Sequence, residues 1–391
     1  MPRRIKSQLD KNAGTALLLG AGYCAKAMIA PLLARGYDVQ ATTRSPEKAA
    51  QLKKLGATPI IYNGTLNAAM RASLENAAII LSSIPPNDNG DPFLNNLPKP
   101  FSKIAAKAHW VGYLSATSVY GDRNGQWAFE EELLRPLTRR GKNRAIAELE
   151  WLESETAVHI FRLAGIYGPG RNGFERLRQG KARAVIKDRH VVNRIHLDDI
   201  VSALLASIDR PSPFSIYNLA DGNPAPPQDV VNFAADLIDA PRPPQLNHDT
   251  AEISDMARSF YKETKRIDIS HAKRGLGWAP KYENYRQGLM ATLKSERGET
   301  ETVYLSGYID VPKEDIKAVK LALPAHIRLS RQEPDCKSFN IRQDDSLPTR
   351  FHVIESFISP AAFRRHQDRM KTSEWALVSG NASRFYDIIG T

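Results

Sequence analysis

Two short segments near the start of the chain have residue types suited to binding a dinucleotide. The first, from Gly20 to Ala25, has the spacing G-x-G-x-x-A, in which glycine lets the backbone approach a pyrophosphate at the start of a helix. About 20 residues further on, an acidic residue would bond the 2′-hydroxyl of NAD, whereas a basic one would accept the 2′-phosphate of NADP. Arg44 and Ser45 stand there without a carboxylate. The pattern predicts an NADP site, with NAD as the alternative if Arg44 is only a solvated loop residue. The predicted cofactor residues here are Gly20, Gly22, Tyr23, Cys24, Ala25, Arg44 and Ser45.

The apolar runs around these segments alternate between strand and helix patterns. Residues 15–22 and 37–44 have the short apolar runs of strands, and residues 25–36 and 45–56 have the pattern of helices. Later runs continue this βαβα order up to about residue 293. The order predicts an α/β fold of the Rossmann type, a doubly wound, mostly parallel sheet with helices on both faces. The glycine motif would then form a turn from strand to helix.

Length and composition limit the class of protein. A chain of 391 residues, with 42% hydrophobic and 25% charged residues, is expected to form two globular domains. The net charge of +11 could indicate nucleic-acid binding, but the basic residues are scattered and no basic stripe contains aromatic residues. A basic surface also suits an anionic small molecule. We therefore expect a small-molecule substrate and no nucleic-acid partner.

The cysteines and the longest apolar runs bear on metal sites and location. Cys24 and Cys336 are the only cysteines, and their separation predicts neither a disulfide framework nor a metal site. No apolar run approaches the 18 or so residues that a membrane span needs, and residues 1–14 lack the apolar segment of a secretory signal. We predict a cytoplasmic protein without a membrane partner, whose basic first residues form a solvated tail.

Six segments resemble the extended short-chain dehydrogenase/reductase superfamily, the NAD-dependent epimerase/dehydratase group. They are GAGYCA, SSIPPNDNGDPFL, YLSATSVYGD, FRLAGIYGPGR, NRIHLDDIVSAL and IYNLADG, and the resemblance extends over residues 14–295. The segment Ser83-Ile84-Pro85 is similar to an atypical branch and is expected to contact the cofactor. The resemblance also implies that Gly165 and Tyr167 lie beside the nicotinamide, and that the chain beyond them forms a small substrate-binding subdomain across a cleft.

The proton relay of that superfamily is missing from this chain. Its members typically have Tyr-x-x-x-Lys followed four residues later by Glu, and the cation keeps the pKa of the Tyr low enough for the phenol to act as a base. Aligning this Glu on Glu148 puts Arg144 at the Lys position and Arg140 at the Tyr position. Because an Arg side chain stays protonated, neither can be a general base.

By the same resemblance, four side chains remain candidates for positions near the substrate or the cofactor. Ser115 and Thr117 match the hydroxyl groups that polarise the substrate oxygen. Tyr120 could supply a phenol, or it could only pack. Arg144 could hold the ribose or a phosphate of the cofactor. We therefore expect Ser115, Thr117, Tyr120 and Arg144 near the reacting groups.

A second domain is predicted at residues 300–391, after the polar linker at 295–301. Its apolar pattern has the order βαββαβ, with the first helix at 314–323. One layer of helices can cover only one face of such a sheet, so the other face needs a partner. We expect a homodimer joined sheet to sheet through this domain.

This domain resembles the antibiotic biosynthesis monooxygenase domain, a ferredoxin-like dimeric barrel whose members include cofactor-independent quinol monooxygenases. The resemblance rests on LSRQEPDC, Phe339, Glu355 and AAFRRHQ. It implies a catalytic role for His366, with Glu333, Phe339 and Glu355 at other recurring positions. Trp375 and His366 are candidates to line a pocket for an aromatic substrate.

Three hypotheses about function follow from these resemblances. In the first, the larger domain is an NADP-dependent oxidoreductase or epimerase, and the smaller domain is a monooxygenase or partner in the same pathway. In the second, the larger domain binds NADP without turnover, as a sensor or scaffold, and the smaller domain sets the oligomer. In the third, only the smaller domain is catalytic, as a cofactor-independent quinol-type monooxygenase that depends on His366.

Overall fold

The computed structural model describes residues 13–98 and 100–391, so most of the predicted N-terminal tail lies outside the described residues. The chain folds into two compact units. Unit 1 consists of the residues up to Tyr167 together with 187–226 and 248–281, and unit 2 consists of 168–186, 227–247 and 282–391. None of the helices in the described part has the length and apolar character needed to cross a bilayer.

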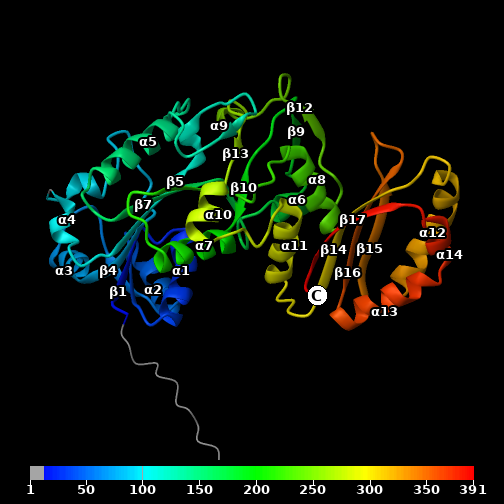
Figure 1. Ribbon diagram of the computed structural model, residues 1–391, viewed down its shortest axis with the longest axis horizontal. Coiled ribbons are helices and arrows are strands. Elements are labelled where there is room, and N and C mark those ends of the chain that lie inside the picture. The colour runs from blue at the N-terminus through cyan, green and yellow to red at the C-terminus, as the bar shows by residue number, and fades with distance from the viewer. Residues whose placement is uncertain (1–12, 99) are drawn as a thin grey trace, which may run out of the picture. The chain divides into compact units, whose positions relative to one another are not determined.

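The centre of unit 1 is a parallel sheet of seven strands, which confirms the predicted Rossmann-type fold (Figure 1). Its strands are β1 (Thr15–Leu19), β2 (Asp38–Thr43), β3 (Thr58–Ile61), β4 (Ala77–Ser82), β5 (Trp110–Ala116), β7 (Val158–Leu163) and β11 (Ile216–Leu219). They lie in the order β11-β7-β5-β4-β1-β2-β3, which reverses between β1 and β4. The sequence pattern did not predict β3, which contains Pro59 and lies at an edge, where a missing N–H is tolerated.

Helices cover both faces of this sheet. Strand β1 shows why the sequence requires this, because it has apolar residues on both of its faces. Ala16 and Leu18 point into one core, Leu17 and Leu19 point into the other, and all four are 0% exposed. The helices of unit 1 are α1 (Tyr23–Ala34), α2 (Pro46–Lys54), α3 (Ala68–Asn76), α4 (Phe101–Ile104), α5 (Arg139–Leu152), α7 (Leu197–Asp209), α9 (Asp255–Phe260) and α10 (Ser270–Leu276), with the 3₁₀ helices η1 (Leu94–Asn96) and η2 (Thr117–Tyr120). Two small parallel sheets pair β8 (Gly165–Tyr167) with β10 (Arg194–His196), and β6 (Trp127–Ala128) with β13 (Arg266–Ile267).

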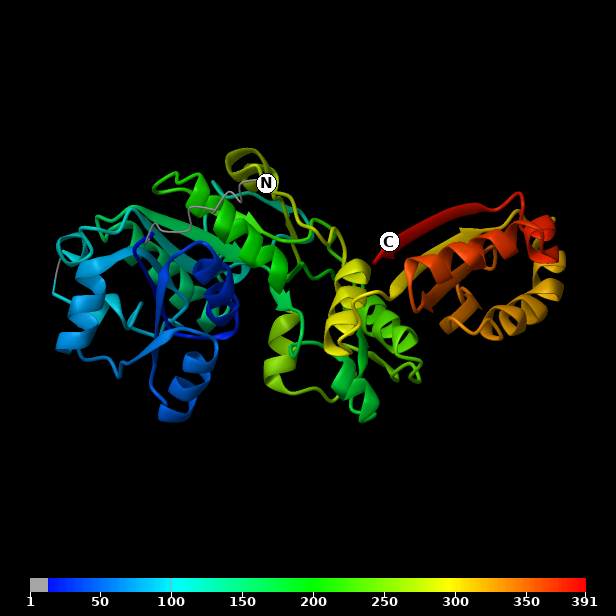
Figure 2. The same ribbon diagram turned by 90° about the horizontal axis from the view of Figure 1, so that it is seen from below.

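Unit 2 contains three segments of the larger predicted domain and all of the smaller one. The first group of elements is α6 (Phe174–Arg178), β9 (Ala184–Ile186), α8 (Pro227–Leu237), β12 (Gln245–Asn247) and α11 (Tyr285–Glu296). The second group is β14 (Val303–Asp310), α12 (Ile316–Arg331), β15 (Cys336–Gln343), β16 (Arg350–Phe357), α13 (Pro360–Lys371), α14 (Glu374–Val378) and β17 (Ser383–Ile389). Its four strands form an antiparallel sheet in the order β15-β16-β14-β17 (Figure 1), and Figure 2 shows this sheet nearly edge-on with the orange helices on one side. The predicted ferredoxin-like fold is confirmed, with α14 as an additional short helix.

Helix α12 is longer than the sequence pattern predicts. The predicted helix ended at Leu323, before Pro324, because proline removes an N–H donor and clashes with the preceding turn. Helix α12 instead continues to Arg331, and His326 and Ser330 extend its buried face beyond the proline. Packing of this face against the sheet therefore outweighs a local cost of about 3 kcal/mol.

The two faces of the C-terminal sheet are covered by different parts of unit 2. Helices α12 and α13 cover one face, where Phe339 and Phe357 are buried in the core. On the opposite face, the start of α11 contacts β17, because the amide groups of Asn284 and Gln287 donate to Asp387 Oδ1 at 3.1 and 2.8 Å. Helix α11 of the same chain therefore covers part of the sheet face on which we predicted a partner subunit.

Candidate functional site

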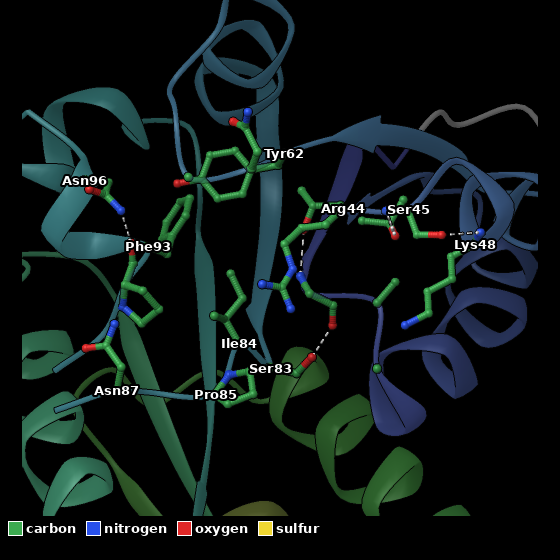
Figure 3. A pocket seen from close by; sticks show the side chains of 18 residues that line it. Arg44, Ser45, Lys48, Tyr62, Ser83, Ile84, Pro85, Asn87, Phe93 and Asn96 are labelled. Carbon is green, nitrogen blue, oxygen red and sulfur yellow. Dashed lines mark hydrogen bonds between the residues drawn. The ribbon is translucent and has the colours of Figure 1, made fainter. Parts of the chain in front are cut away.

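A pocket of about 650 Å³ lies in unit 1 at the carboxyl ends of β1 to β4 (Figure 3). Because these strands flank the point where the strand order reverses, the pocket lies where open α/β sheets bind their ligands. It is lined by Gly20, Ala21, Gly22, Thr42, Thr43, Arg44, Ser45, Lys48, Tyr62, Asn63, Gly64, Ser83, Ile84, Pro85, Asn87, Pro92, Phe93 and Asn96. Seven of the predicted cofactor residues are brought together here, namely Gly20, Gly22, Arg44, Ser45, Ser83, Ile84 and Pro85.

Gly20 shapes the turn between β1 and α1. Its φ of +76° lies in the left-handed region, and a Cβ atom there would come within 2.9 Å of Ile84 Cγ1, so both the backbone and the packing require glycine. The N–H of Gly20 donates to Thr42 Oγ1 at 2.7 Å, and the hydroxyl of Ser83 donates to the carbonyl oxygen of Gly20. The ends of β2 and β4 therefore hold the turn from two sides.

Gly22 needs a different explanation. Its φ of −79° is open to any residue, and a Cβ atom would be 3.8 Å from its nearest neighbours, which is ordinary contact. Neither the backbone nor the packing of the described residues therefore requires glycine. As the N-cap residue of α1 it also has no side chain with which to cap the first turn. The position leaves room for an anion at a helix N-terminus, the arrangement on which phosphate-binding turns depend.

Two cations stand on the α2 side of the pocket. Arg44 follows β2, Lys48 lies in the first turn of α2, and both side chains extend into the pocket lining (Figure 3). No lining residue is Asp or Glu. Ser45 caps α2 by accepting from the N–H of Lys48 at 3.3 Å, and its hydroxyl donates to Glu47, which lies outside the lining. The pocket therefore has two positive groups with no carboxylate to neutralise them from within.

Several lining residues were missed by the sequence reading. Lys48 could have been found, because a residue in the first turn of the helix after β2 lies close to the strand end that carries Arg44. Tyr62 and Asn96 come from segments without a motif, whereas Phe93, whose ring centroid is 5.8 Å from that of Tyr62, lies in SSIPPNDNGDPFL but was given no role. Only the fold brings these three residues to the pocket.

Five predicted cofactor residues lie outside this pocket. Cys24 and Ala25 are buried in α1 with 7% and 0% exposure, and Tyr23 packs against the same core. Gly165 and Tyr167 lie in β8, which pairs with β10. The roles assigned to these five residues remain predictions.

Ser115, at the end of β5, is bonded to a buried ion pair. Glu148 on α5 and Arg162 on β7, each with a side chain 3% exposed, lie 2.9 Å apart, and the hydroxyl of Ser115 donates to Glu148. Arg162 also donates to the hydroxyl of Tyr120 at 2.8 Å, and this hydroxyl donates to Asn218 Oδ1 at 2.7 Å. Burial raises the pKa of Tyr120 to about 12. Both hydroxyl groups thus belong to a structural network, which favours the packing alternative for Tyr120.

Arg144, at the position of the relay lysine, is also bonded within unit 1. Its Nη1 atom donates to the carbonyl oxygen of Leu114 at 2.8 Å and to the hydroxyl of Tyr113 at 3.0 Å. Burial nevertheless raises the pKa of Tyr113 above its usual value, so this phenol does not replace the missing base. Arg140 is exposed and Thr117 is half-buried in η2. The cation at the lysine position therefore fixes α5 to β5.

In unit 2, His366 on α13 lies between two carboxyl groups. Its Nδ1 atom is 3.1 Å from both carboxylate oxygens of Glu333, and its Nε2 atom is 3.6 Å from Glu355 Oε2. The ring centroids of Phe339 and Phe357 are 5.5 and 4.6 Å from that of His366. Burial lowers the pKa of His366 and raises that of Glu355 to about 8. An imidazole in this position can pass a proton between two acids.

Trp375, predicted to share a pocket with His366, stacks on His326 with a centroid distance of 4.4 Å and an angle of 12°. Burial lowers the pKa of His326 to about 3. Phe339 contacts both imidazoles, with its centroid 5.0 Å from that of His326. His326 was not singled out in the sequence, because it lies in the part of α12 that continues past the proline.

Comparison with known proteins assigns the larger part of the chain. It is 30% identical over 223 residues to Protein YeeZ of Escherichia coli (strain K12), covering 53% of this chain and 78% of that protein. The chain belongs to the family of Protein YeeZ. The solved structure of a functionally unknown conserved protein from Silicibacter pomeroyi DSS is 41% identical with a TM-score of 0.69, over 72% of this chain and 99% of that chain.

The fold and the C-terminal region of this YeeZ-family protein are assigned by two further matches. UDP-glucuronic acid 4-epimerase from Bacillus cereus, solved in complex with NAD, is 17% identical with a TM-score of 0.58, over 73% of this chain and 99% of that chain. Residues 302–376 match the family described as antibiotic biosynthesis monooxygenase. The predicted fusion is confirmed: an epimerase/dehydratase-type short-chain dehydrogenase/reductase fold is joined to an antibiotic biosynthesis monooxygenase domain.

Proposed function

We propose that this YeeZ-family protein is an oxidoreductase that binds NADP(H). One observation carries the proposal: Arg44 and Lys48 face a pocket whose lining contains no carboxylate. A ribose 2′-phosphate presents anionic oxygens that a guanidinium and an ammonium group can bind. A 2′-hydroxyl would instead require an acceptor such as Asp or Glu. The epimerase with a similar fold was solved with NAD, which supports dinucleotide binding by this fold.

Different residues of the pocket would bind different parts of the cofactor. The turn from Gly20 to Gly22 and the start of α1 would hold the pyrophosphate. The rings of Tyr62 and Phe93 would give the adenine an apolar wall, and Arg44 with Lys48 would bind the 2′-phosphate. The nicotinamide of the bound cofactor would donate or accept a hydride.

Nucleotide titration of the full-length protein tests this proposal. NADPH and NADH are compared by nucleotide fluorescence, and 2′,5′-ADP is compared with 5′-AMP as a competitor. Losing a charge-assisted hydrogen bond costs about 1.5–3 kcal/mol, so Arg44→Ala should weaken NADPH binding by about 10- to 100-fold and leave NADH binding nearly unchanged. Lys54→Ala, which removes a positive charge at the end of α2 outside the pocket lining, is the matched control. Equal binding of NADPH and NADH by the wild type would refute the assignment of the 2′-phosphate site.

The second candidate is a protein that binds NADP without turning it over, as a sensor or scaffold. The observation that favours it is Arg144, whose guanidinium is bonded to Tyr113 and Leu114 at the place where the relay lysine would stand. Turnover separates the two candidates. Oxidation of NADPH, followed by its absorbance with a panel of carbonyl and sugar-nucleotide substrates, would support the oxidoreductase. Tight binding without oxidation across that panel would support the sensor.

The third candidate is oxidation of a quinol-type aromatic compound by the C-terminal domain. It is favoured by the contacts of His366 with Glu333 and Glu355, since this imidazole could remove a phenolic proton and pass it on. Oxygen consumption with a hydroquinone should then fall at least about 100-fold in His366→Ala, the scale of one general base. His352→Ala, on the other face of the same sheet, is the control. Equal rates in the two variants would exclude this candidate.

We also propose that the protein forms a homodimer through the C-terminal domain. Strand β17 is at an edge of its sheet and exposes Phe385 by 50%, Tyr386 by 40% and Ile388 by 39%. Such an edge can pair with a second chain. Sedimentation should show a dimer for the wild type and a monomer for Ile388→Lys. Leu321→Lys, at an 84% exposed position of α12, should stay dimeric.

A further inference from the structure

The turn that leads into β10 places a histidine in an unusual environment. It runs from Lys187 through Asp188 and Arg189 to His190, after β9 has ended. The side chains of Asp188 and Arg189 are 92% and 93% exposed, whereas His190 is 2% exposed. Arg189 has a φ of 53°, in the left-handed region that non-glycine residues seldom adopt. A strained residue on the surface thus accompanies an imidazole that is turned inward.

His190 is buried without hydrogen bonds. Neither of its ring nitrogens, nor the buried Nε2 atom of His248, has a hydrogen-bond partner among the residues that the structure describes. His159 shows the ordinary arrangement of a buried histidine: Nδ1 is 3.1 Å from the carbonyl oxygen of Val111, and Nε2 accepts from the N–H of Ser212 at 2.9 Å. Buried polar groups are nearly always paired, because an unpaired one weakens the fold. Three unpaired nitrogens in one place therefore indicate a site for a ligand.

The two histidines converge on one aromatic ring. The centroid of Tyr261 is 4.9 Å from that of His190 and 5.1 Å from that of His248. The ammonium group of Lys187 donates to the carbonyl oxygen of Tyr261, and Arg258 reaches the carbonyl oxygen of His248 at 3.4 Å. Segments that are about 60 residues apart in sequence are tied into one cluster by these contacts.

The charges around this cluster are mostly positive. Burial, together with Lys187, His248 and Arg194, lowers the pKa of His190 to about 4, and Asp122 opposes this shift. Asp122 is already bonded, because its Oδ1 atom accepts from the N–H of Thr264 at 2.7 Å. Asp249 Oδ1 also lies 2.9 Å from Nδ1 of His248, but this side chain is 83% exposed, so solvent screens its charge. The less exposed cations Lys187 and Arg194 would repel a metal cation and attract an anion.

We propose that His190, His248, Tyr261 and Lys187 form a binding subsite for an oxyanion, a phosphoryl or carboxylate group of a small-molecule ligand. The oxygen atoms of such a group accept hydrogen bonds from the imidazole N–H groups and from the Lys187 ammonium. None of these four residues lines the cofactor pocket, so the subsite is independent of the proposed function. It is also separate from the motifs that carry the family resemblance.

Histidine NMR on the full-length protein tests the subsite directly. The protein is labelled with ¹⁵N-histidine and titrated with inorganic phosphate, pyrophosphate and acetate, and signals are assigned with His190→Gln and His248→Gln. We expect saturable shifts of the His190 and His248 signals and no shift of the His159 signal, whose nitrogens are both bonded. Stronger shifts with phosphate or with acetate identify which oxyanion the subsite prefers. Absence of shifts with all three anions, or equal shifts of His159, overturns the proposal.

Stability measurements give a second, independent test. His190→Phe removes the two unpaired nitrogens and keeps a ring, so its melting temperature without added anion should be higher than that of the wild type, and the stabilisation by pyrophosphate should be lost. His190→Gln should weaken pyrophosphate binding by about tenfold. His352→Gln, in the C-terminal sheet, should behave like the wild type. Retained stabilisation by pyrophosphate in His190→Phe, or saturable shifts of both signals with one equivalent of Zn²⁺, overturns the oxyanion subsite.

Discussion

Replacing Glu148 by Ala should strongly destabilise unit 1. Its carboxylate accepts three hydrogen bonds from Arg162, from Nε at 3.2 Å to each oxygen and from Nη2 at 2.9 Å. Both side chains are 3% exposed, so the variant would leave a buried guanidinium with two neutral acceptors, the hydroxyl of Tyr120 and the carbonyl oxygen of Glu130. Breaking one partner of a buried ion pair costs about 3–5 kcal/mol. Because two acceptors remain, we expect a loss of about 3–4 kcal/mol in the free energy of unfolding.

The assay is urea denaturation followed by tryptophan fluorescence. Four of the five tryptophans, Trp110, Trp127, Trp151 and Trp278, lie in unit 1. Glu148→Gln keeps an acceptor oxygen, so its free energy of unfolding should fall by about half as much as that of Glu148→Ala. The double variant Glu148→Leu with Arg162→Met removes both charges and should recover most of the free energy of unfolding that Glu148→Ala loses. Glu153→Ala, at the exposed end of the same helix, should change stability by less than about 0.5 kcal/mol. A loss below about 1 kcal/mol in Glu148→Ala, or a double variant no more stable than the single one, would refute the reasoning from an uncompensated charge.

The two glycines of the turn should respond oppositely to alanine. Gly20→Ala, with its φ of +76° and its contact with Ile84, should lower the free energy of unfolding by about 1–3 kcal/mol in thermal melting, whereas Gly22→Ala should keep its stability and lose at least about tenfold in NADPH affinity. Unchanged NADPH affinity in Gly22→Ala would contradict the anion site at α1. Glu355 has a pKa raised from 4.5 to about 8, so the folded state holds its proton more tightly than the unfolded state, and stability falls as the pH rises between these values. Glu355→Gln should therefore stabilise unit 2 near pH 8 and have little effect near pH 5, and thermal melts with the opposite dependence would contradict this.

The parts of the fold that could be predicted are those encoded in neighbouring residues. The uninterrupted apolar run of β1 requires two covered faces, and the glycine spacing that follows requires a turn into a helix. The absence of a carboxylate around Arg44 can likewise be read from the sequence without the structure. The limits of such reading appear at Pro324, because local propensity says nothing of the burial that continues α12 to Arg331. Strand β3 was not predicted, because the types of its four residues do not show that it lies at the edge of the sheet.

The candidate sites show more clearly which features depend on the sequence alone and which depend on the tertiary structure. The sequence by itself determined the glycine turn after β1 and the loss of the relay, since both depend on residue types at fixed spacing. Only the tertiary structure decided that Ser115 bonds Glu148, that α11 lies on the C-terminal sheet, and that His190 and His248 meet at Tyr261. Apart from the contact of His248 with Tyr261, these contacts join segments more than 30 residues apart. A hydrogen-bond partner or a covering helix at such a separation leaves no periodic pattern in the sequence. Residue types therefore predict which chemistry is available, and packing decides which groups remain free to perform it.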